Sequence, residues 1–229
     1  MGRSVLITGG TGGLGSAVTT AFLDAGWRAV VPWIAERELS RVPERSGLEL
    51  VQADLFDVDS ARECATVAAS DVDNPLRAVV NLVGGFAAGG RVHETPVEEF
   101  EEQLRLNLRA TYLTCQHTLP HLTEAGGGSI VCMSTRAALH PFSGAAGYIA
   151  SKAAVLALVA ALDTEYAGDG VRVNAVLPGV IDTPANRKAM PDSTRADWVA
   201  PADIARTILF LSGDEASPIS GARVPVHRA

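Results

Sequence analysis

The sequence is short of the residues that mark secreted, membrane-spanning or nucleic-acid-binding proteins. Its three cysteines, Cys64, Cys115 and Cys132, fit neither a disulfide framework nor a metal site, so we expect buried thiols in a reducing compartment. No stretch of about 18 apolar residues free of charge is present, which argues against a membrane-spanning helix. With 19 basic and 26 acidic residues the net charge is −7, whereas surfaces that bind nucleic acid are basic.

The amino terminus shows no signal for export or lipid attachment. Residues 3–7 lead directly into a glycine-rich segment, without the apolar core of a signal peptide. Leu6 stands where a myristoylation signal would need Ser or Thr. We therefore expect a cytoplasmic protein that binds neither membranes nor nucleic acids.

Apolar residues, by contrast, make up 47% of the 229 residues, enough for one sizeable core. Short apolar runs alternate with helical patterns along the whole chain. This alternation predicts an α/β fold, with a single Rossmann-type doubly wound parallel β-sheet flanked by helices on both faces. We predict strands at residues 4–7, 29–33, 48–52, 78–82, 129–133, 171–176 and 223–226, and helices at about 13–26, 57–69, 96–124 (one or two), 147–168 and 201–212. Residues 1–229 are expected to form one domain, with a candidate substrate lid around 180–200.

A glycine-rich segment joins the first predicted strand to the first predicted helix. It reads Thr8-Gly9-Gly10-Thr11-Gly12-Gly13-Leu14-Gly15. Glycines at such a junction let a phosphate group reach the backbone N–H groups of a helix amino terminus, because no side chain stands in the way. In this strand–loop–helix setting the segment indicates dinucleotide binding, although a merely flexible turn would have a similar composition.

The end of the second predicted strand departs from the usual dinucleotide pattern. An acidic residue there normally binds the adenosine ribose, but this chain has Trp33 followed by Ile34. Arg37 and Arg41 come soon after, and they could reach a 2′-phosphate or be solvated residues of the next helix. These two bases slightly favour NADP(H) over NAD(H).

Two further strand ends carry candidate cofactor contacts. Asp54, with Leu55, follows the third strand, and its carboxylate could accept from the adenine amino group or cap the next helix. Asn81 ends the fourth strand, and the small residues that follow, including Val83 and Gly84, would let a cofactor lie against the sheet edge.

Tyr148 and Lys152 are four residues apart in a helical pattern and therefore lie on one face of that helix. A phenol with an unperturbed pKa of about 10 is a poor acid–base catalyst at neutral pH. A nearby ammonium stabilises the phenolate and lowers that pKa. The pair becomes a candidate catalytic site because it follows the fifth strand and because a phosphate-binding loop lies upstream.

Together these residues resemble those of short-chain dehydrogenase/reductases, over essentially the whole chain. The matching segments are Thr8-Gly9 with Gly13-Leu14-Gly15, Asp54, Asn81 to Gly84, Asn107, Tyr148 with Lys152, Arg172 to Asn174, and Pro178-Gly179. The glycines fit the family's form T-G-x-x-x-G-x-G. The resemblance implies an NAD(P)(H)-dependent oxidoreductase that transfers hydride between nicotinamide and a carbonyl or alcohol substrate.

The resemblance also implies individual roles. Tyr148 would be the general acid/base, Lys152 would lower its pKa and hold the nicotinamide ribose, and Asn107 would support a proton relay. The family's serine lies thirteen residues before the tyrosine, where this chain has Thr135. We expect Thr135 to take its place, because its hydroxyl also donates and accepts. Ser134 is the alternative, should the following loop shift by one residue.

The segment after the sixth strand resembles the family's nicotinamide-contacting turn. It contains Pro178 and Gly179, and it implies that the Ile181 backbone binds the carboxamide while Thr183 approaches the phosphates or the carboxamide. Thr183 could also simply cap a helix. Residues 84–90 and 181–191 locally resemble dihydropteridine reductases, which reduce a quinonoid pterin, although Trp33 departs from the acidic residue of those enzymes.

The sequence also bears on the substrate pocket, on a competing function, on metal binding and on partners. Phe86, His140, Met190 and Trp198 would line a substrate pocket or serve only as packing. A non-catalytic dinucleotide-binding regulatory protein is the competing hypothesis. No metal is expected, since His117 and His121, although four apart, lack an evident third ligand. The partner should be a small-molecule substrate, and helices at about 103–124 and 147–168 resemble those that form four-helix interfaces in the family, implying a homotetramer or homodimer.

Overall fold

The computed structural model describes residues 2–227, and seven parallel strands in it form one sheet. The strands are β1 (Ser4–Thr8), β2 (Arg28–Trp33), β3 (Leu48–Gln52), β4 (Leu76–Asn81), β5 (Gly128–Met133), β6 (Val171–Pro178) and β7 (Arg223–Val226). Their order across the sheet is β3-β2-β1-β4-β5-β6-β7. The predicted doubly wound α/β fold is confirmed.

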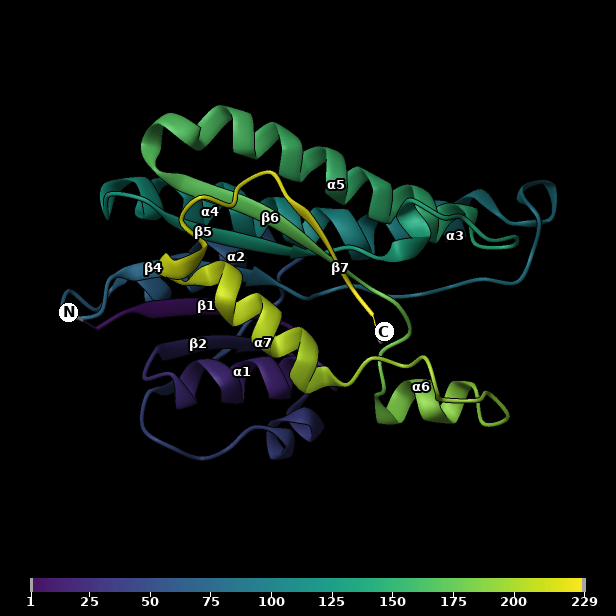
Figure 1. Ribbon diagram of the computed structural model, residues 1–229, viewed down its shortest axis with the longest axis horizontal. Coiled ribbons are helices and arrows are strands. Elements are labelled where there is room, and N and C mark those ends of the chain that lie inside the picture. The colour runs from purple at the N-terminus through teal and green to yellow at the C-terminus, as the bar shows by residue number, and fades with distance from the viewer. Residues whose placement is uncertain (1, 228–229) are drawn as a thin grey trace.

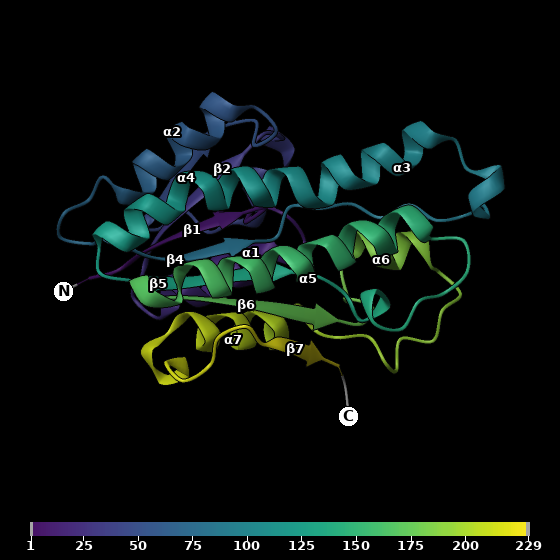
Figure 2. The ribbon, with the colours of Figure 1, turned by 90° about the horizontal axis from the view of Figure 1, so that it is seen from above.

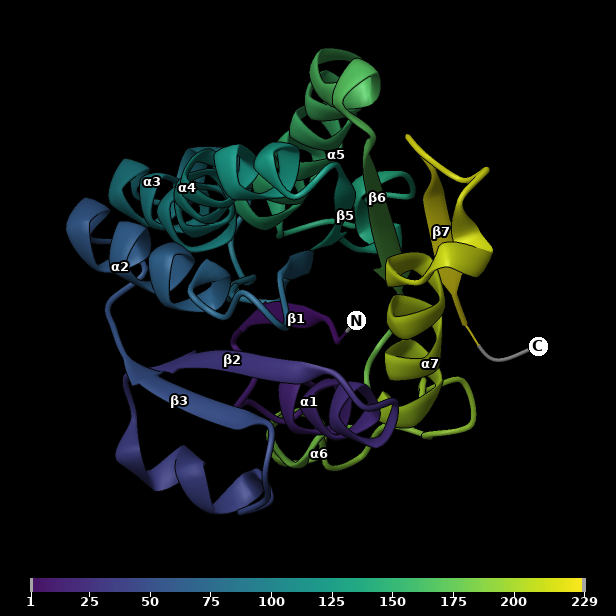
Figure 3. The ribbon, with the colours of Figure 1, turned by 90° about the vertical axis from the view of Figure 1, so that its left-hand side faces the viewer.

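Helices cover both faces of this sheet, as the end-on view in Figure 3 shows. They are α1 (Gly15–Asp24), α2 (Val58–Ala69), α3 (Val97–Leu104), α4 (Ala110–Glu124), α5 (Ala146–Tyr166), α6 (Pro184–Ala189) and α7 (Pro201–Ser212). Side chains of α2, α4 and α5 pack with one face of the sheet, and those of α1 and α7 pack with the other. Because the central strands are covered on both sides, their residues are apolar almost without alternation.

The chain reverses its direction of travel across the sheet between β1 and β4, which are neighbours. Thr8 at the end of β1 is in register with Asn81 at the end of β4. In open α/β sheets ligands bind beyond the carboxyl ends of the strands at such a point. Figures 1 and 2 show α3 and α6 extending past this end of the sheet, so they flank the place where a ligand is expected.

Three local features differ from the predicted elements. The predicted helix over 96–124 is interrupted by a π-helical turn, Arg105–Arg109, between α3 and α4. A 3-10 helix at Glu36–Arg41 follows β2. The irregular segment around 180–200 contains α6, which begins because Thr183 accepts a hydrogen bond from the Asn186 N–H and Pro184 occupies the first turn.

One helical stretch of the described chain, Ala146–Asp169, is long and apolar enough to cross a membrane by length and composition. It comprises α5 and the short turn after it. α5 packs along β6 and against α3, and it carries Lys152 into the protein interior, where the side chain is 4% exposed. The helix is thus an integral part of the fold and of the candidate site.

Candidate active site

The glycine segment forms a tight turn between β1 and α1. Gly9 has a φ of +67°, a conformation that residues with a side chain rarely adopt. The Gly12 N–H donates to the Gly9 carbonyl at 3.0 Å, and a Cβ atom on Gly15 would overlap that carbonyl oxygen. The backbone of this turn therefore approaches itself too closely for side chains at these positions.

The amino terminus of α1 is open to a ligand. Its cap residue, Leu14, makes no side-chain capping hydrogen bond, and the first turn holds no acidic residue. Thr183 lies directly opposite, since a Cβ atom on Gly13 would be 3.2 Å from the Thr183 Cβ. A diphosphate fits this cradle, with the helix N–H groups on one side and the Thr183 region on the other.

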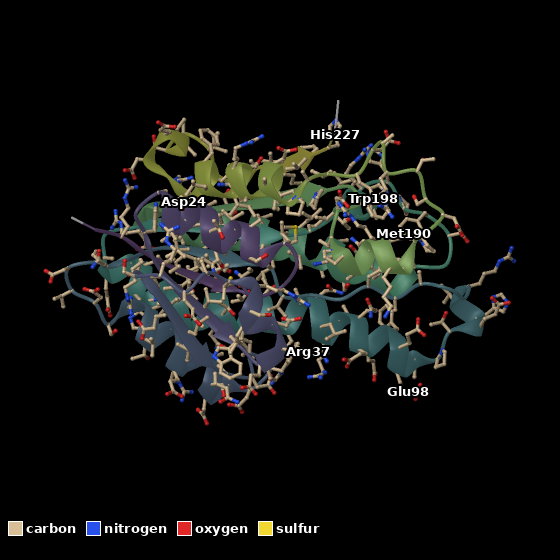
Figure 4. The ribbon with its side chains drawn as sticks, turned by 90° about the horizontal axis from the view of Figure 1, so that it is seen from below. Asp24, Arg37, Glu98, Met190, Trp198 and His227 are labelled. Atoms are coloured by element: carbon tan, nitrogen blue, oxygen red, sulfur yellow. The ribbon has the colours of Figure 1, made fainter. Side chains whose placement is uncertain are left out.

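Beside this cradle, the 3-10 helix after β2 brings an acidic residue, Glu38, against the glycine turn. Thr11 donates from its hydroxyl to the Glu38 carboxylate at 3.2 Å, and Arg41 pairs with the same carboxylate at 3.0 Å. Arg37 is exposed (Figure 4). Trp33 is partly buried at the end of β2. No pattern in the sequence distinguishes Glu38 from the other charged residues of this segment.

The predicted contacts after β3 are only partly available. One carboxylate oxygen of Asp54 accepts from the Phe56 N–H at 2.9 Å, so this residue forms a local turn and has one oxygen left for a ligand. The Leu55 side chain is 6% exposed and packs in the core. Only the Leu55 backbone could therefore reach a cofactor.

The end of β4 is joined closely to the glycine turn. Leu82 donates its N–H to the Thr8 hydroxyl at 3.2 Å, and the side-chain oxygen of the buried Asn81 has no hydrogen-bond partner among residues 2–227. Val83 is partly buried. A Cβ atom on Gly84 would lie 2.5 Å from Oδ1 of Asn107 and 3.0 Å from Nζ of Lys152. The absence of a side chain at Gly84 therefore keeps these two polar groups next to the sheet edge.

Asn107 lies in the π-helical turn that separates α3 from α4. Its Oδ1 accepts from the Gly85 N–H at 3.1 Å, and its Nδ2 donates to the carbonyl oxygens of Gly85 and Gln103, each at 3.1 Å. These bonds fix the side chain against the loop after β4. π-Helical turns often occur at functional sites because they shift the backbone hydrogen bonding locally.

The structure brings Thr135, and not Ser134, to Tyr148. The Thr135 side chain lies close enough to the Tyr148 phenol to lower the pKa of that phenol by hydrogen bonding. Ser134 is buried and donates its hydroxyl to the Lys152 carbonyl at 2.9 Å, so it holds β5 to α5. Ser134 is therefore not placed to supply the catalytic hydroxyl as the alternative to Thr135.

Tyr148 and Lys152 are both affected by burial. Burial raises the pKa of Tyr148, and the hydrogen bond from Thr135 partly counteracts this by lowering it. Burial lowers the pKa of Lys152 to about 8, and its Nζ donates to the Met133 carbonyl at 3.1 Å. The pKa of Tyr148 responds to burial and to Thr135, and the expectation that Lys152 lowers it stays a prediction.

The hydrogen bonds of the turn after β6 leave a backbone N–H that could bind a carboxamide. The Ile181 carbonyl accepts from the Thr183 N–H and from Asn186 Nδ2, each at 2.8 Å. These bonds occupy the carbonyl oxygen and leave the Ile181 N–H as the group that could bind a ligand. Pro178 ends β6, and Gly179 is tied to β7 through its N–H, which donates to Val226 at 3.2 Å.

A cavity of about 350 Å³ lies between α3, the start of α5 and the loop after β4. Its lining is mostly apolar and comprises Ala87, Val92, Thr95, Val97, Glu99, Phe100, Gln103 and Gly144 to Tyr148. Phe86 packs edge-on against the Tyr148 ring at 4.9 Å between centroids. Gln103, which the sequence-based account missed, is 4% exposed; its place one helical turn before Asn107 is the signal that could have identified it.

Some of the other predicted pocket residues are exposed, and one is packed in the interior. Trp198 is 5% exposed and packs in the interior, whereas Met190 is 36% exposed; both belong to the 180–200 segment (Figure 4). His140 is exposed. Within residues 2–227 no group of three or more His, Cys, Asp or Glu side chains is placed to hold a metal ion.

Residues 3–194 match the family model of short chain dehydrogenases. The chain belongs to the short-chain dehydrogenase/reductase family. It is similar to 2-(R)-hydroxypropyl-CoM dehydrogenase of Xanthobacter autotrophicus, with 31% identity over 100% of this chain and 98% of that protein. It is also similar to 2,5-dichloro-2,5-cyclohexadiene-1,4-diol dehydrogenase LinX of Sphingobium indicum, with 31% identity over 98% of this chain and 94% of that protein.

The fold agrees with that of solved family members. The structure titled "ElxO with NADP Bound" matches with a TM-score of 0.90 and 25% identity, over 99% of this chain and 97% of that one. The short-chain dehydrogenase/reductase is therefore an NAD(P)-dependent oxidoreductase. The local resemblance to dihydropteridine reductases is not shown by these relatives and stays a prediction.

Proposed function

We propose that Tyr148 is the general acid/base in a hydride transfer between NAD(P)(H) and a carbonyl or alcohol substrate. The observation that carries this proposal is that the Thr135 side chain lies close enough to the Tyr148 phenol to lower its pKa, where Tyr148 lines a largely apolar cavity. Two hydroxyl groups that meet at one point can both address a single substrate oxygen. Such a pair suits proton transfer to or from that oxygen.

The proton chemistry follows from the surroundings of each group. In the reducing direction a nicotinamide coenzyme, when bound, would supply a hydride to the carbonyl carbon. Tyr148 then donates its proton to the oxygen, while the Thr135 hydroxyl donates a hydrogen bond to the same oxygen as its charge develops. Because burial raises the pKa of Tyr148, the phenol stays protonated, and so able to donate, throughout the neutral range.

Lys152 and Asn107 are proposed to position the coenzyme and the path of the proton. Gly84 brings the loop after β4 close to the Lys152 ammonium and to the Asn107 amide. We infer that Lys152 holds the nicotinamide ribose from this position and that the π-helical turn at Asn107 connects Tyr148 to solvent for proton return. The diphosphate would lie on the glycine turn, opposite Thr183, and the Ile181 N–H would bind the carboxamide.

The cavity beside Tyr148 favours a neutral, mainly apolar substrate. Glu99 is the charged residue of its lining, so an anionic group would meet no cation there. Gln103 places one amide among apolar walls. That amide suits a single hydrogen-bonding group of the substrate away from the reacting carbon. The 180–200 segment, which reaches Gly13 through Thr183, would act as the lid.

The surface formed by α5, the π-helical turn and the adjoining ends of α3 and α4 supports a homo-oligomer. A groove of about 410 Å³ lies there, lined by Leu104, Arg105, Leu108, Arg109, Tyr112, Ala154 and Leu158. Small residues on α5, such as Ala157, Ala160 and Ala161, are exposed and would let a second copy approach closely. We propose a homodimer or homotetramer in the cytoplasm, and light scattering that finds only the monomer mass would contradict it.

The coenzyme preference depends on few residues. Arg37 and Arg41 slightly favour NADP(H) over NAD(H), but Arg41 is paired with Glu38. The support that remains for NADP(H) is the exposed Arg37 and the NADP bound to the solved relative.

A turnover assay with NADH and NADPH tests the proposed function. The substrates should include neutral ketones, quinones and a quinonoid dihydropterin, with secondary alcohols for the reverse reaction. We expect oxidation of at least one coenzyme with a neutral apolar carbonyl and less than a tenth of that rate, roughly, with an anionic analogue, because a buried unpaired charge is costly. Protein that binds a coenzyme but turns over none of these substrates would contradict the proposal.

A further inference from the structure

The carboxylate of Glu38 is held against the glycine turn by two polar contacts. Its Oε2 accepts from the Thr11 hydroxyl at 3.2 Å, and its Oε1 accepts from Arg41 at 3.0 Å. Thr11 is 4% exposed, whereas the Glu38 side chain is 29% exposed. The carboxylate therefore has a fixed place at the protein surface and keeps access to solvent or to a ligand.

This place lies where the adenosine ribose of a bound dinucleotide should lie. Thr11 belongs to the turn that joins β1 to α1, and the 3-10 helix of Glu38 starts three residues after β2 ends at Trp33. In dinucleotide-binding sheets a carboxylate following β2 accepts hydrogen bonds from the ribose hydroxyls. The strand end itself offers an indole instead of an acid.

We infer that Glu38 supplies this missing carboxylate and makes the enzyme select NAD(H) over NADP(H). This inference rests on the proposed placement of the dinucleotide along the glycine turn. A carboxylate can only accept hydrogen bonds, so it suits the 2′-hydroxyl of NAD(H). It opposes the 2′-phosphate of NADP(H), which also only accepts hydrogen bonds and carries negative charge.

The neighbouring charges do not compensate for this repulsion. The glycine turn, residues 8–15, contains no charged residue, and the segment Glu36–Arg41 contains two acids and two bases, so its net charge is zero. Arg41 is engaged by Glu38 itself. Arg37 is the base that is left, and it is exposed, so its attraction for a phosphate is weakened by solvent screening.

Calorimetric titration with NADH and NADPH tests the inference without relying on turnover. We expect the unmodified enzyme to bind NADH at least about tenfold more tightly than NADPH, because like charges placed together oppose binding. Glu38→Gln keeps the side-chain shape and removes the charge. It should reduce that preference at least about fivefold, mainly through tighter NADPH binding. Thermal unfolding confirms that the variants fold.

Two control variants and a second pair of probes locate the effect. Glu36→Gln makes the same charge change on the same 3-10 helix, where the carboxylate is exposed, and should leave the preference within about twofold because exposed charges are screened. Arg41→Met should not weaken NADPH binding selectively. Titration with ADP-ribose and 2′-phospho-ADP-ribose should reproduce the discrimination, since these probes carry the adenosine ribose and lack nicotinamide.

The outcomes separate this inference from the proposed function. Equal or tighter binding of NADPH by the unmodified enzyme, or an unchanged preference in Glu38→Gln, would overturn the role of Glu38 while leaving the oxidoreductase intact. Selective loss of NADPH binding in Arg41→Met would also overturn it, because Arg41 would then be reading the phosphate. Failure to bind either dinucleotide would overturn both.

Discussion

Gly84 lies so close to Asn107 that a Cβ atom on Gly84 would be 2.5 Å from the Asn107 side-chain oxygen. The same Cβ atom would be 3.0 Å from the Lys152 ammonium. The first distance is shorter than packed atoms allow, and the second is a tight contact that requires a small shift of Lys152. A side chain at this position would therefore displace Asn107 and press on Lys152.

Gly84→Ala should displace Asn107 or Lys152 and reduce activity by more than about tenfold, since small misplacements of catalytic groups are costly. It should also lower the free energy of unfolding by about 1–3 kcal/mol through overpacking. Gly89→Ala is the matched control, because a Cβ atom there would meet nothing within 4 Å. Equal effects of the two substitutions on turnover and on denaturant unfolding would show that Gly84 has no special position.

Lys152 should make stability depend on pH in the alkaline range. Burial lowers its pKa from 10.5 to about 8, so below pH 8 the lysine is protonated in both the folded and the unfolded chain. Between pH 8 and 10.5 the unfolded chain binds a proton that the folded chain has released, and the free energy of unfolding therefore rises with pH. Over this window the contribution amounts to roughly 3 kcal/mol at most.

Comparison with Lys152→Met isolates that contribution. The substituted chain lacks the titrating group, so its free energy of unfolding should rise less than that of the original chain between pH 7 and about 10, with the other groups cancelling in the difference. Urea titrations of both coenzyme-free proteins at several pH values measure this. Parallel pH profiles would mean that Lys152 is not held in the interior as a destabilised cation.

Substitutions at Thr135 and at Ser134 should have different effects, the first mainly on catalysis and the second mainly on stability. Thr135→Ala removes a hydroxyl from the partner of Tyr148 and should reduce kcat about 100-fold or more, as loss of an oxyanion donor does, while Thr135→Ser should stay within about tenfold of the original rate. Ser134→Ala removes the bond to the Lys152 carbonyl. It should cost about 1 kcal/mol of stability with a smaller change in kcat. The reverse pattern in steady-state kinetics and unfolding would assign the catalytic hydroxyl to Ser134.

Much of the fold could be predicted from the sequence because its signals are local. Each of the central strands is a short apolar run, and a sheet covered on both faces needs such runs. The glycine segment and the four-residue spacing of Tyr148 and Lys152 depend on neighbours along the chain. They could be recognised without knowing which parts of the chain meet in space.

The parts that could not be predicted depend on contacts between distant segments. Glu38 and Thr11 are 27 residues apart, and nothing in the sequence distinguishes Glu38 from the adjacent charges. Which of Ser134 and Thr135 faces Tyr148 depends on the rotation of the chain as it leaves β5. The raised pKa of Tyr148 is a consequence of burial, which a sequence pattern does not quantify.

Tyr148 is proposed to transfer the proton that accompanies hydride transfer. Tyr148→Phe keeps the ring that packs edge-on against Phe86 and removes only the hydroxyl. Tyr166→Phe, at the other end of α5, is the control for loss of a phenol from the same helix. Both variants should bind coenzyme as the original chain does.

The deciding measurement is single-turnover oxidation of bound coenzyme by the best carbonyl substrate in the original chain and in these two variants. We expect Tyr148→Phe to lower the rate by about 100-fold to 10,000-fold, the range for losing a general acid, with coenzyme affinity and thermal stability nearly unchanged. Tyr166→Phe should keep the original rate. Retention of the full rate by Tyr148→Phe would rule out proton transfer by Tyr148.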